Sequence, residues 1–143
     1  MAQPLRVEVD WTRIAARGDP LWQDSFCLYG YLNPRADQIL YIGKADYQTV
    51  RQRTHGRHKA ELFEYLCDHC KSDELSIIHG QLLLEAGRRF STQLLADVES
   101  LLIKRLQPPG NISSTCSRIY RPGLRVKCTG DWPHRRTGFH DWN

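Results

Sequence analysis

The stretch that most limits how this chain can fold runs from residue 26 to residue 43. Two short runs of aromatic and branched side chains, at 26–32 and 39–43, flank a polar bend at 33–38. Such runs favour strands, and a bend rich in turn-forming residues favours a chain reversal. Pro34 has no backbone donor and a restricted φ, so it belongs in the bend. The stretch therefore predicts a β-hairpin with Tyr29 and Tyr41 on neighbouring strands.

The residues after the hairpin predict two helices and a third strand. A basic segment at 50–59 holds three arginines, one lysine and two histidines. It is either a solvated charged surface or a surface that contacts phosphates. Asp46 or Thr49 would cap a short helix within it, and Gly56 should end that helix. Apolar spacing then predicts a helix over 60–70 and a strand over 74–84, with a bulge at Gly80.

A strong amphipathic helix is predicted from about residue 92 to residue 106, capped by Ser91 or Thr92. Glu99 lies within its apolar face, four residues after Leu95 and four before Ile103. A carboxylate in that position loses hydration, which is costly unless the group is paired or binds a metal. From the helix alone, a buried ion pair with an arginine and a metal site are both open.

The two ends of the chain carry weaker patterns. Residues 7–11 alternate like a short strand within an N-terminal arm that is expected to pack on the core. Residues 112–143 are expected to be loop-like, with cations and aromatics interleaved. This composition suits either a nucleic-acid groove or a tail whose aromatics pin it to the core. The cations of the tail are Arg118, Arg121, Arg125, Lys127, Arg135 and Arg136.

Composition excludes several classes of protein. With 143 residues, of which 41% are hydrophobic and 25% charged, the chain fits a single globular domain. It has no apolar run of about 18 residues, so a membrane span is not expected, and no apolar core of signal-peptide type at its N-terminus. These features predict a cytoplasmic protein. The net charge of +4 is compatible with a polyanionic partner.

Five cysteines without an export signal favour free thiols over a disulfide framework. Cys67 and Cys70 have the spacing of a metal-ligand pair, and Cys116 and Cys128 would complete a zinc site. The first pair also falls in a predicted helix, where residues three apart commonly share a core-facing side. A small zinc-stabilised binding protein is therefore one alternative function.

Five sequence elements follow one another at characteristic spacing: a tyrosine tripeptide on each hairpin strand, an arginine with a histidine four residues later, a helical glutamate and an asparagine beyond that helix. They are Cys27-Leu28-Tyr29, Tyr41-Ile42-Gly43, Arg51 with His55, Glu99 and Asn111. With these elements the chain resembles the GIY-YIG nuclease superfamily over residues 26–111. Lys44 is also common after the second tripeptide of that family, whereas Cys27 departs from its usual glycine.

The resemblance implies an α/β fold in which a small three-stranded antiparallel sheet is flanked by helices. Residues 1–143 would form one nuclease domain, with a motif core at 26–111, an N-terminal arm at 1–25 and a basic aromatic tail at 112–143. The implied activity is metal-dependent endonucleolytic cleavage of DNA. Restriction-type enzymes and repair or phage nicking enzymes are both open.

The resemblance also implies roles for individual residues. Glu99 would hold one Mg²⁺ or Mn²⁺ per site, because a carboxylate is a hard oxygen ligand. Tyr29 would accept a proton from the attacking water, and Tyr41 would position that water or a phosphate oxygen. Arg51 would grip the scissile phosphate, and His55 would add positive charge that lowers the phenol pKa.

Duplex DNA is the implied partner, together with a homodimer if both strands are cut. Arg53 would replace Arg51 as the catalytic arginine if the loop after Lys44 carries a small insertion, but only Arg51 has a histidine four residues later. A nucleic-acid-binding module that kept the fold and lost catalysis is a further alternative, slightly favoured by Cys27. The residues expected to contact DNA are Lys44, Arg53, Arg57, His58, Lys59, Asn111, Arg135 and Arg136.

Overall fold

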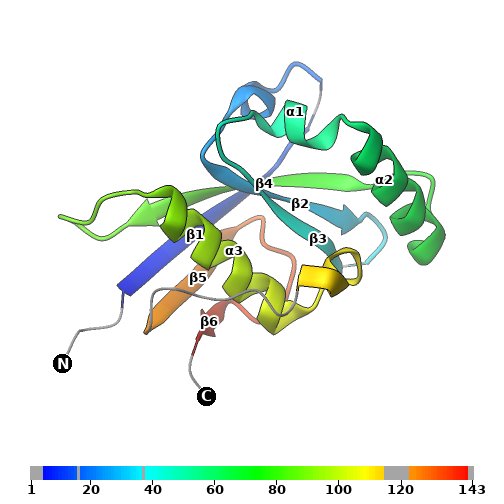
Figure 1. The fold of residues 1–143 in the computed structure, drawn as a ribbon. Coiled ribbons are helices and arrows are strands. Elements are labelled where there is room, and N and C mark those ends of the chain that lie inside the picture. Colours follow the sequence, from blue (N-terminus) through cyan, green and yellow to red (C-terminus); the bar gives the residue numbers. More distant parts are fainter. Residues whose placement is uncertain (1–4, 16, 37, 115–122, 142–143) are drawn as a thin grey trace.

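The structure is a computed structural model that describes residues 5–15, 17–36, 38–114 and 123–141. Within these residues, six strands form one mixed sheet in the order β3-β2-β4-β1-β5-β6 (Figure 1). The strands are β1 Leu5–Arg13, β2 Cys27–Asn33, β3 Gln38–Ala45, β4 Ser76–Leu84, β5 Leu124–Gly130 and β6 Gly138–His140. Neighbouring strands run antiparallel except β1 and β5, which are parallel.

Helices cover both faces of the sheet (Figure 1). They are α1 Val50–Thr54, α2 Arg57–Cys70 and α3 Thr92–Leu106, with short 3₁₀ turns η1 Pro20–Gln23 and η2 Pro109–Ser114. The apolar stripe of α3 packs with the main core of the sheet, whereas Val50 of α1 and Leu66 of α2 pack in two smaller clusters with β2 and β3. None of the helices in the described ranges is long and apolar enough to span a bilayer.

The predicted hairpin is confirmed. β2 and β3 pair antiparallel, with Tyr29 opposite Gly43 and Tyr31 opposite Tyr41. Two of the three predicted helices, α1 and α3, begin at their predicted caps, whereas α2 begins at Arg57, earlier than the predicted residue 60, and has no side-chain cap. The Thr49 side chain forms a reciprocal capping box with Gln52 at the start of α1, and the Ser91 hydroxyl accepts from the Leu94 backbone N–H at 3.0 Å.

The predicted sheet of three antiparallel strands is wrong, because the sheet has six strands and is mixed. The three predicted strands exist as β2, β3 and β4, but the N-terminal arm supplies β1 and the tail supplies β5 and β6. Each added long strand alternates buried and exposed residues. Strand β1 buries its apolar residues by pairing with β4, which extends the sheet beyond the three predicted strands. Strand β5 then pairs in parallel with β1 and extends the sheet further.

The expected bulge at Gly80 is also wrong, since β4 pairs with β1 in an unbroken register through this residue. Gly80 lies directly opposite Trp11. A Cβ added to Gly80 would lie 2.9 Å from the Trp11 ring and 2.9 Å from a methyl group of Val9. The glycine therefore makes room for a large buried ring that packs across the strand.

We expect Phe139→Ala to destabilise the fold strongly, because Phe139 of β6 is 2% exposed and meets the Trp132 ring edge-on at 6.1 Å. Removing a buried phenylalanine ring costs about 3–5 kcal/mol. Phe90→Ala is the matched control, since Phe90 is 40% exposed and should cost less than about 1 kcal/mol. Urea unfolding measures both. Equal losses would mean that the tail strand is not part of the core.

Candidate active site

The phenol of Tyr29 crosses the neighbouring strand β3. Tyr29 is fully buried on β2, and a Cβ added to Gly43 would lie 2.6 Å from its hydroxyl oxygen and its Cζ atom. The ring therefore lies over Gly43 and can do so only because this residue has no side chain. Its hydroxyl is buried and makes no hydrogen bond of good geometry with a described residue, although the Tyr41 phenol lies close enough to interact with it. A buried hydroxyl in that state is available to a ligand or a water molecule.

A second phenol and a lysine lie beside Tyr29. The ammonium group of Lys59, on α2, donates to the Tyr41 hydroxyl at 2.6 Å. The same nitrogen lies 4.3 Å from the centre of the Tyr41 ring and 5.8 Å from that of Tyr29, and the two ring centres are 6.1 Å apart. Two phenols and one cation therefore gather at β3, which is one of the two edge strands of the sheet.

Burial sets the protonation of Tyr29. Loss of hydration, and next the neighbouring phenol of Tyr41, raise the pKa of Tyr29, while the charge of Arg53 lowers it by less. The Tyr29 phenol is therefore protonated at neutral pH in the protein alone. This opposes the predicted role of Tyr29 as the proton acceptor, which required nearby cations to outweigh burial.

The Glu99 carboxylate approaches the same cluster from α3. Burial raises its pKa, while Lys44, Arg53 and Lys59 lower it and Asp46 raises it further. Among the residues that the structure describes, no hydrogen bond or ion pair shorter than 4 Å holds this carboxylate; the direct ion pairs there are Lys44 with Asp46 and Asp24 with His79. The predicted alternative of a direct ion pair with an arginine is thus not formed within this part of the chain.

Arg53, not Arg51, faces the cluster. The charge of Arg53 acts on both Tyr29 and Glu99, and its Nε atom is buried without a hydrogen-bond partner in the described part of the chain. Residues two apart on a helix point about 200° apart, so only one of the two arginines on α1 can face the site. Arg51 is exposed and lines a separate hollow of about 500 Å³ with Trp22 and His55.

The histidine four residues after Arg51, which favoured that arginine, has a local structural role. His55 ends α1, and its Nδ1 atom lies 2.8 Å from the Arg51 carbonyl oxygen. Its ring also meets Trp22 edge-on, with the ring centres 6.0 Å apart. The spacing of Arg51 and His55 therefore follows from how a one-turn helix ends, and not from proximity to Glu99.

Asn111 closes the outer side of β3. Its side-chain oxygen accepts from the Ile42 N–H at 2.8 Å, and its side-chain nitrogen donates to the Ile42 carbonyl at 2.9 Å. Asn111 is 3% exposed, and its amide pairs with the strand as another strand would. These bonds show that Asn111 holds the backbone of the strand beside the site, and its predicted contact with DNA stays a prediction.

The remaining predicted DNA contacts fall in two separate regions. Arg57 and His58 are exposed at the start of α2, on the segment that carries Lys59. Arg135 and Arg136 precede β6, at the opposite edge of the sheet from β3, and the Arg136 guanidinium lies 4.9 Å from the centre of the Phe139 ring. Arg118, Arg121 and Cys116 lie outside the described residues.

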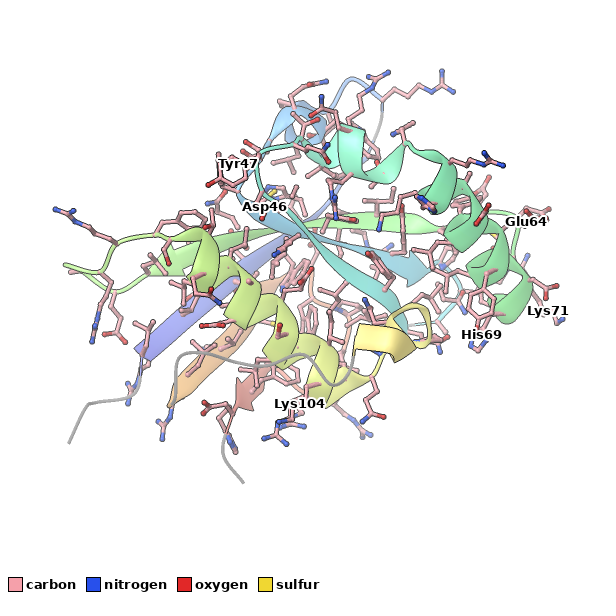
Figure 2. The ribbon with its side chains drawn as sticks, in the orientation of Figure 1. Asp46, Tyr47, Glu64, His69, Lys71 and Lys104 are labelled. Atoms are coloured by element: carbon pink, nitrogen blue, oxygen red, sulfur yellow. The ribbon has the colours of Figure 1, made fainter. Side chains whose placement is uncertain are left out.

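Three exposed aromatic residues near the site were not predicted as functional. Phe26 lies between Tyr47 and Phe90, with ring centres 5.4 Å and 6.0 Å away, and Tyr47 is 80% exposed. Phe26 and Tyr47 both have positive φ, at 56° and 49°, which is unusual for a bulky residue. Figure 2 shows Tyr47 next to Asp46, after β3. No periodicity marks these residues, because they lie in three different loops.

The cysteines of the predicted zinc site are distributed over separate elements. Cys67 and Cys70 lie on α2, while Cys128 is buried on β5 in the main core. Within the described ranges, neither cysteine of α2 belongs to a group of three metal-type ligands.

No family model matches the chain, and no curated protein or solved structure is significantly similar to it. The resemblance to the GIY-YIG superfamily therefore stays a prediction.

We expect Glu99→Gln to stabilise the protein at neutral pH in the absence of divalent metal. A carboxyl with a raised pKa holds its proton more tightly in the folded state, so stability falls as pH rises from the ordinary value of 4.5 through the raised value. Glutamine removes that loss, and the gain should shrink as the pH falls below about 4.5. Urea unfolding in EDTA at several pH values measures it.

Glu64→Gln is the matched control, because Glu64 is an exposed glutamate on α2 (Figure 2). It should change the unfolding free energy by no more than about 0.5 kcal/mol at each pH. If Glu99→Gln instead destabilises the protein at neutral pH, the three nearby cations outweigh the cost of burying the carboxylate.

Proposed function

We propose that this chain is a metal-dependent DNA endonuclease of the GIY-YIG type. The observation that carries the proposal is the meeting of three polar side chains beside β3 that lack strong partners. In the described structure the Tyr29 hydroxyl and the Arg53 Nε are buried without a well-formed hydrogen bond, and the partly buried Glu99 carboxylate has no direct ion pair. Native structures rarely leave such groups unpaired, so a polar ligand is expected to complete them.

A phosphodiester with a divalent cation fits this donor set. Arg53 offers N–H groups to anionic oxygens, Tyr29 offers an O–H, and Glu99 offers hard anionic oxygens. The negative charge of Asp46 also acts on Glu99, which favours a cation beside the carboxylate. A single buried carboxylate suits one Mg²⁺ or Mn²⁺ that keeps most of its water ligands. A bound divalent cation would supply positive charge to the non-bridging and leaving oxygens of the phosphodiester.

The side chains of the site divide the remaining work. The protonated Tyr29 phenol donates a hydrogen bond to a phosphoryl oxygen, and Arg53 neutralises charge on the same group. The Tyr41 oxygen already accepts from Lys59, so its orientation is set before the substrate arrives. Tyr41 then holds the attacking water in line with the phosphorus, and the proton that this water loses as the new P–O bond forms passes to solvent, because the protonated Tyr29 cannot accept it. This division changes the predicted role of Tyr29 from proton acceptor to hydrogen-bond donor, because burial keeps Tyr29 protonated, and it keeps the predicted role of Tyr41.

The surroundings of the site suit a nucleic acid. Lys44 and Lys59 act on the site directly, and Arg57 and His58 extend the positive surface along α2. The exposed rings of Phe26, Tyr47 and Phe90 offer faces on which bases could stack. Duplex DNA, with a homodimer if both strands are cut, is the proposed substrate arrangement. The opposite edge of the sheet, with Arg135 and Arg136, is not part of this surface.

A binding module without catalysis is the second candidate. The raised pKa of Tyr29 favours it, because a protonated phenol cannot act as a base. Cys27, which replaces the usual glycine of the first tripeptide, does not favour a binding module without catalysis. Cys27 packs with Ala45 and Val50 on the inner side of α1, two residues before Tyr29, and so does not alter the groups at β3.

Glu99→Gln should abolish the nicking of supercoiled plasmid in Mg²⁺ while DNA affinity, measured by fluorescence anisotropy, stays within about threefold. The reason is that glutamine keeps the shape of the side chain and removes the charge that holds the cation. Wild-type protein that binds DNA without cutting it would identify the binding module. Cleavage by Glu99→Gln at the wild-type rate would exclude Glu99 as the metal ligand.

Arg53→Ala should lower single-turnover cleavage by roughly a thousandfold or more, the scale of losing a cation that stabilises a phosphoryl transition state. Arg51→Ala is the matched control on the same helix, and we expect less than a tenfold loss because Arg51 lines the other hollow. If Arg51→Ala lowered cleavage more than Arg53→Ala did, the side of α1 that carries Arg51 would face the substrate.

A further inference from the structure

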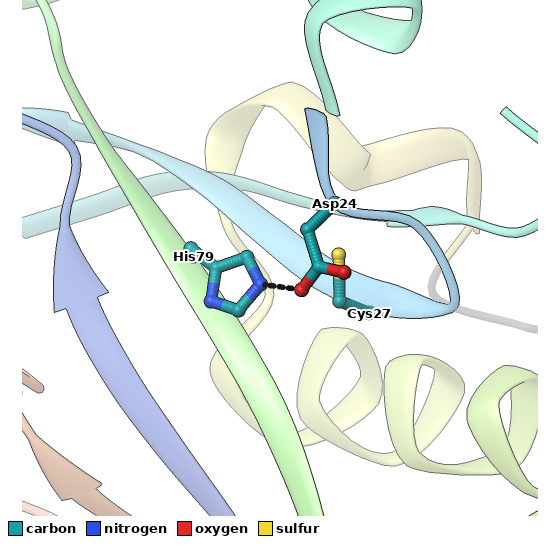
Figure 3. Close-up of side chains that lie close together, drawn as sticks. All are labelled: Asp24, Cys27 and His79. Atoms are coloured by element: carbon teal, nitrogen blue, oxygen red, sulfur yellow. Dashed lines mark hydrogen bonds and ion pairs between the residues drawn. The ribbon is translucent and has the colours of Figure 1, made fainter. Parts of the chain in front are cut away.

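A second group of potential ligands lies on the same sheet face, apart from the unsatisfied groups at β3. Asp24 lies just before β2, Cys27 begins β2 and His79 lies on β4 (Figure 3). One ligand atom from each residue lies within 4.8 Å of the other two. The three residues come together because β2 pairs with β4, which sets Tyr29 opposite His79 and Cys27 two residues away on the same face.

The ligand types and spacing fit a tetrahedral transition-metal ion. Thiolate, imidazole and carboxylate are the groups that bind Zn²⁺, with bonds of roughly 2.0–2.3 Å, so ligand atoms around one ion are about 3.3–3.8 Å apart. The His79 Nε2 and Asp24 Oδ2 atoms are now 2.7 Å apart and would separate by less than about 1 Å to admit an ion.

The environment of the three residues also fits such a site. The other carboxylate oxygen of Asp24 accepts the Ser25 N–H at 3.0 Å, which orients Oδ2 toward His79. His79 and Cys27 are buried, whereas the Asp24 side chain is 39% exposed. The inner side of the site is therefore dry, and water can reach it beside Asp24.

A catalytic Cys-His-Asp arrangement does not fit the same residues. Cys27 is 0% exposed, so its sulfur cannot reach a substrate. Burial, and next the negative charge of Asp24, raise the pKa of the Cys27 thiol to about 12, which suppresses the nucleophilic thiolate.

We propose that Asp24, Cys27 and His79 form a Zn²⁺ site, with a water molecule on the exposed side of Asp24 as the fourth ligand. A new Zn–S bond replaces the Cys27 S–H bond, and the proton passes to solvent. The imidazole of His79 binds through Nε2 and carries its own proton on Nδ1. Because the thiol must lose a proton, affinity rises with pH.

The ion would join elements that the candidate active site depends on. The Asp24 carbonyl accepts the Val50 N–H at 2.9 Å, and Val50 is the first residue of α1, which carries Arg53. Zinc would therefore tie the start of α1 to β2 and β4. The two sites take different ions, since a site with a thiolate selects Zn²⁺ and a carboxylate alone selects Mg²⁺.

Cobalt(II) titration of the full chain, stripped with EDTA and desalted, tests the proposal. Co²⁺ replaces Zn²⁺ and reports a thiolate ligand by a charge-transfer band and tetrahedral geometry by visible bands. We expect both bands with one Co²⁺ per chain, displacement by Zn²⁺ but not Mg²⁺, and a higher melting temperature with Zn²⁺. A folded wild-type chain that gives no thiolate band overturns the proposal.

Cys27→Ser should remove the thiolate band. Asp24→Asn, at a partly exposed position that should tolerate the change, should weaken Zn²⁺ binding by about a hundredfold or more, because even outer-shell partners are worth 10–100-fold. The control is the Cys67→Ser/Cys70→Ser double variant, which should bind as wild type does. A band that disappears in the double variant, or that persists in a folded Cys27→Ser chain, assigns the metal to other cysteines and overturns the proposal.

Discussion

The candidate site depends on one packing constraint, which is that Gly43 has no side chain. The ring of Tyr29 starts on β2 and passes over Gly43, where any Cβ would lie 2.6 Å from the phenol. This brings a buried hydroxyl to the outer strand, where Lys59 and Tyr41 already form a hydrogen bond. Asn111 keeps that strand in place by pairing with Ile42, so the backbone beneath the phenols is satisfied.

Burial and charge oppose each other at this site. Loss of hydration pushes both Tyr29 and Glu99 toward their protonated forms, while Arg53 pulls both the other way. The cations act on the carboxylate without a direct ion pair in the described part of the chain. The site is therefore held in a state of incomplete charge compensation, which a cation and an anionic phosphodiester binding together would relieve.

Helix α1 connects the two proposed metal sites. Its first residue, Val50, bonds to the backbone of Asp24, and Arg53 one turn later faces Glu99 and Tyr29. Cys27 and Tyr29 lie two residues apart on one face of β2, but Cys27 meets His79 of β4 while Tyr29 crosses β3. A structural ion at Asp24, Cys27 and His79 would thus hold the helix that presents Arg53 to the candidate active site.

The sequence by itself determined the local elements. Alternating aromatics set the hairpin, caps set the starts of α1 and α3, and helical spacing put Glu99 on the inner face of α3. Only the tertiary structure decided the rest. Strand β1 pairs with β5 more than a hundred residues later, Arg53 and not Arg51 lies close enough to act on Glu99, and Asp24 meets His79, which lies 55 residues later on β4. Local patterns encode which face of an element is apolar, but the partner of that face is chosen by long-range packing.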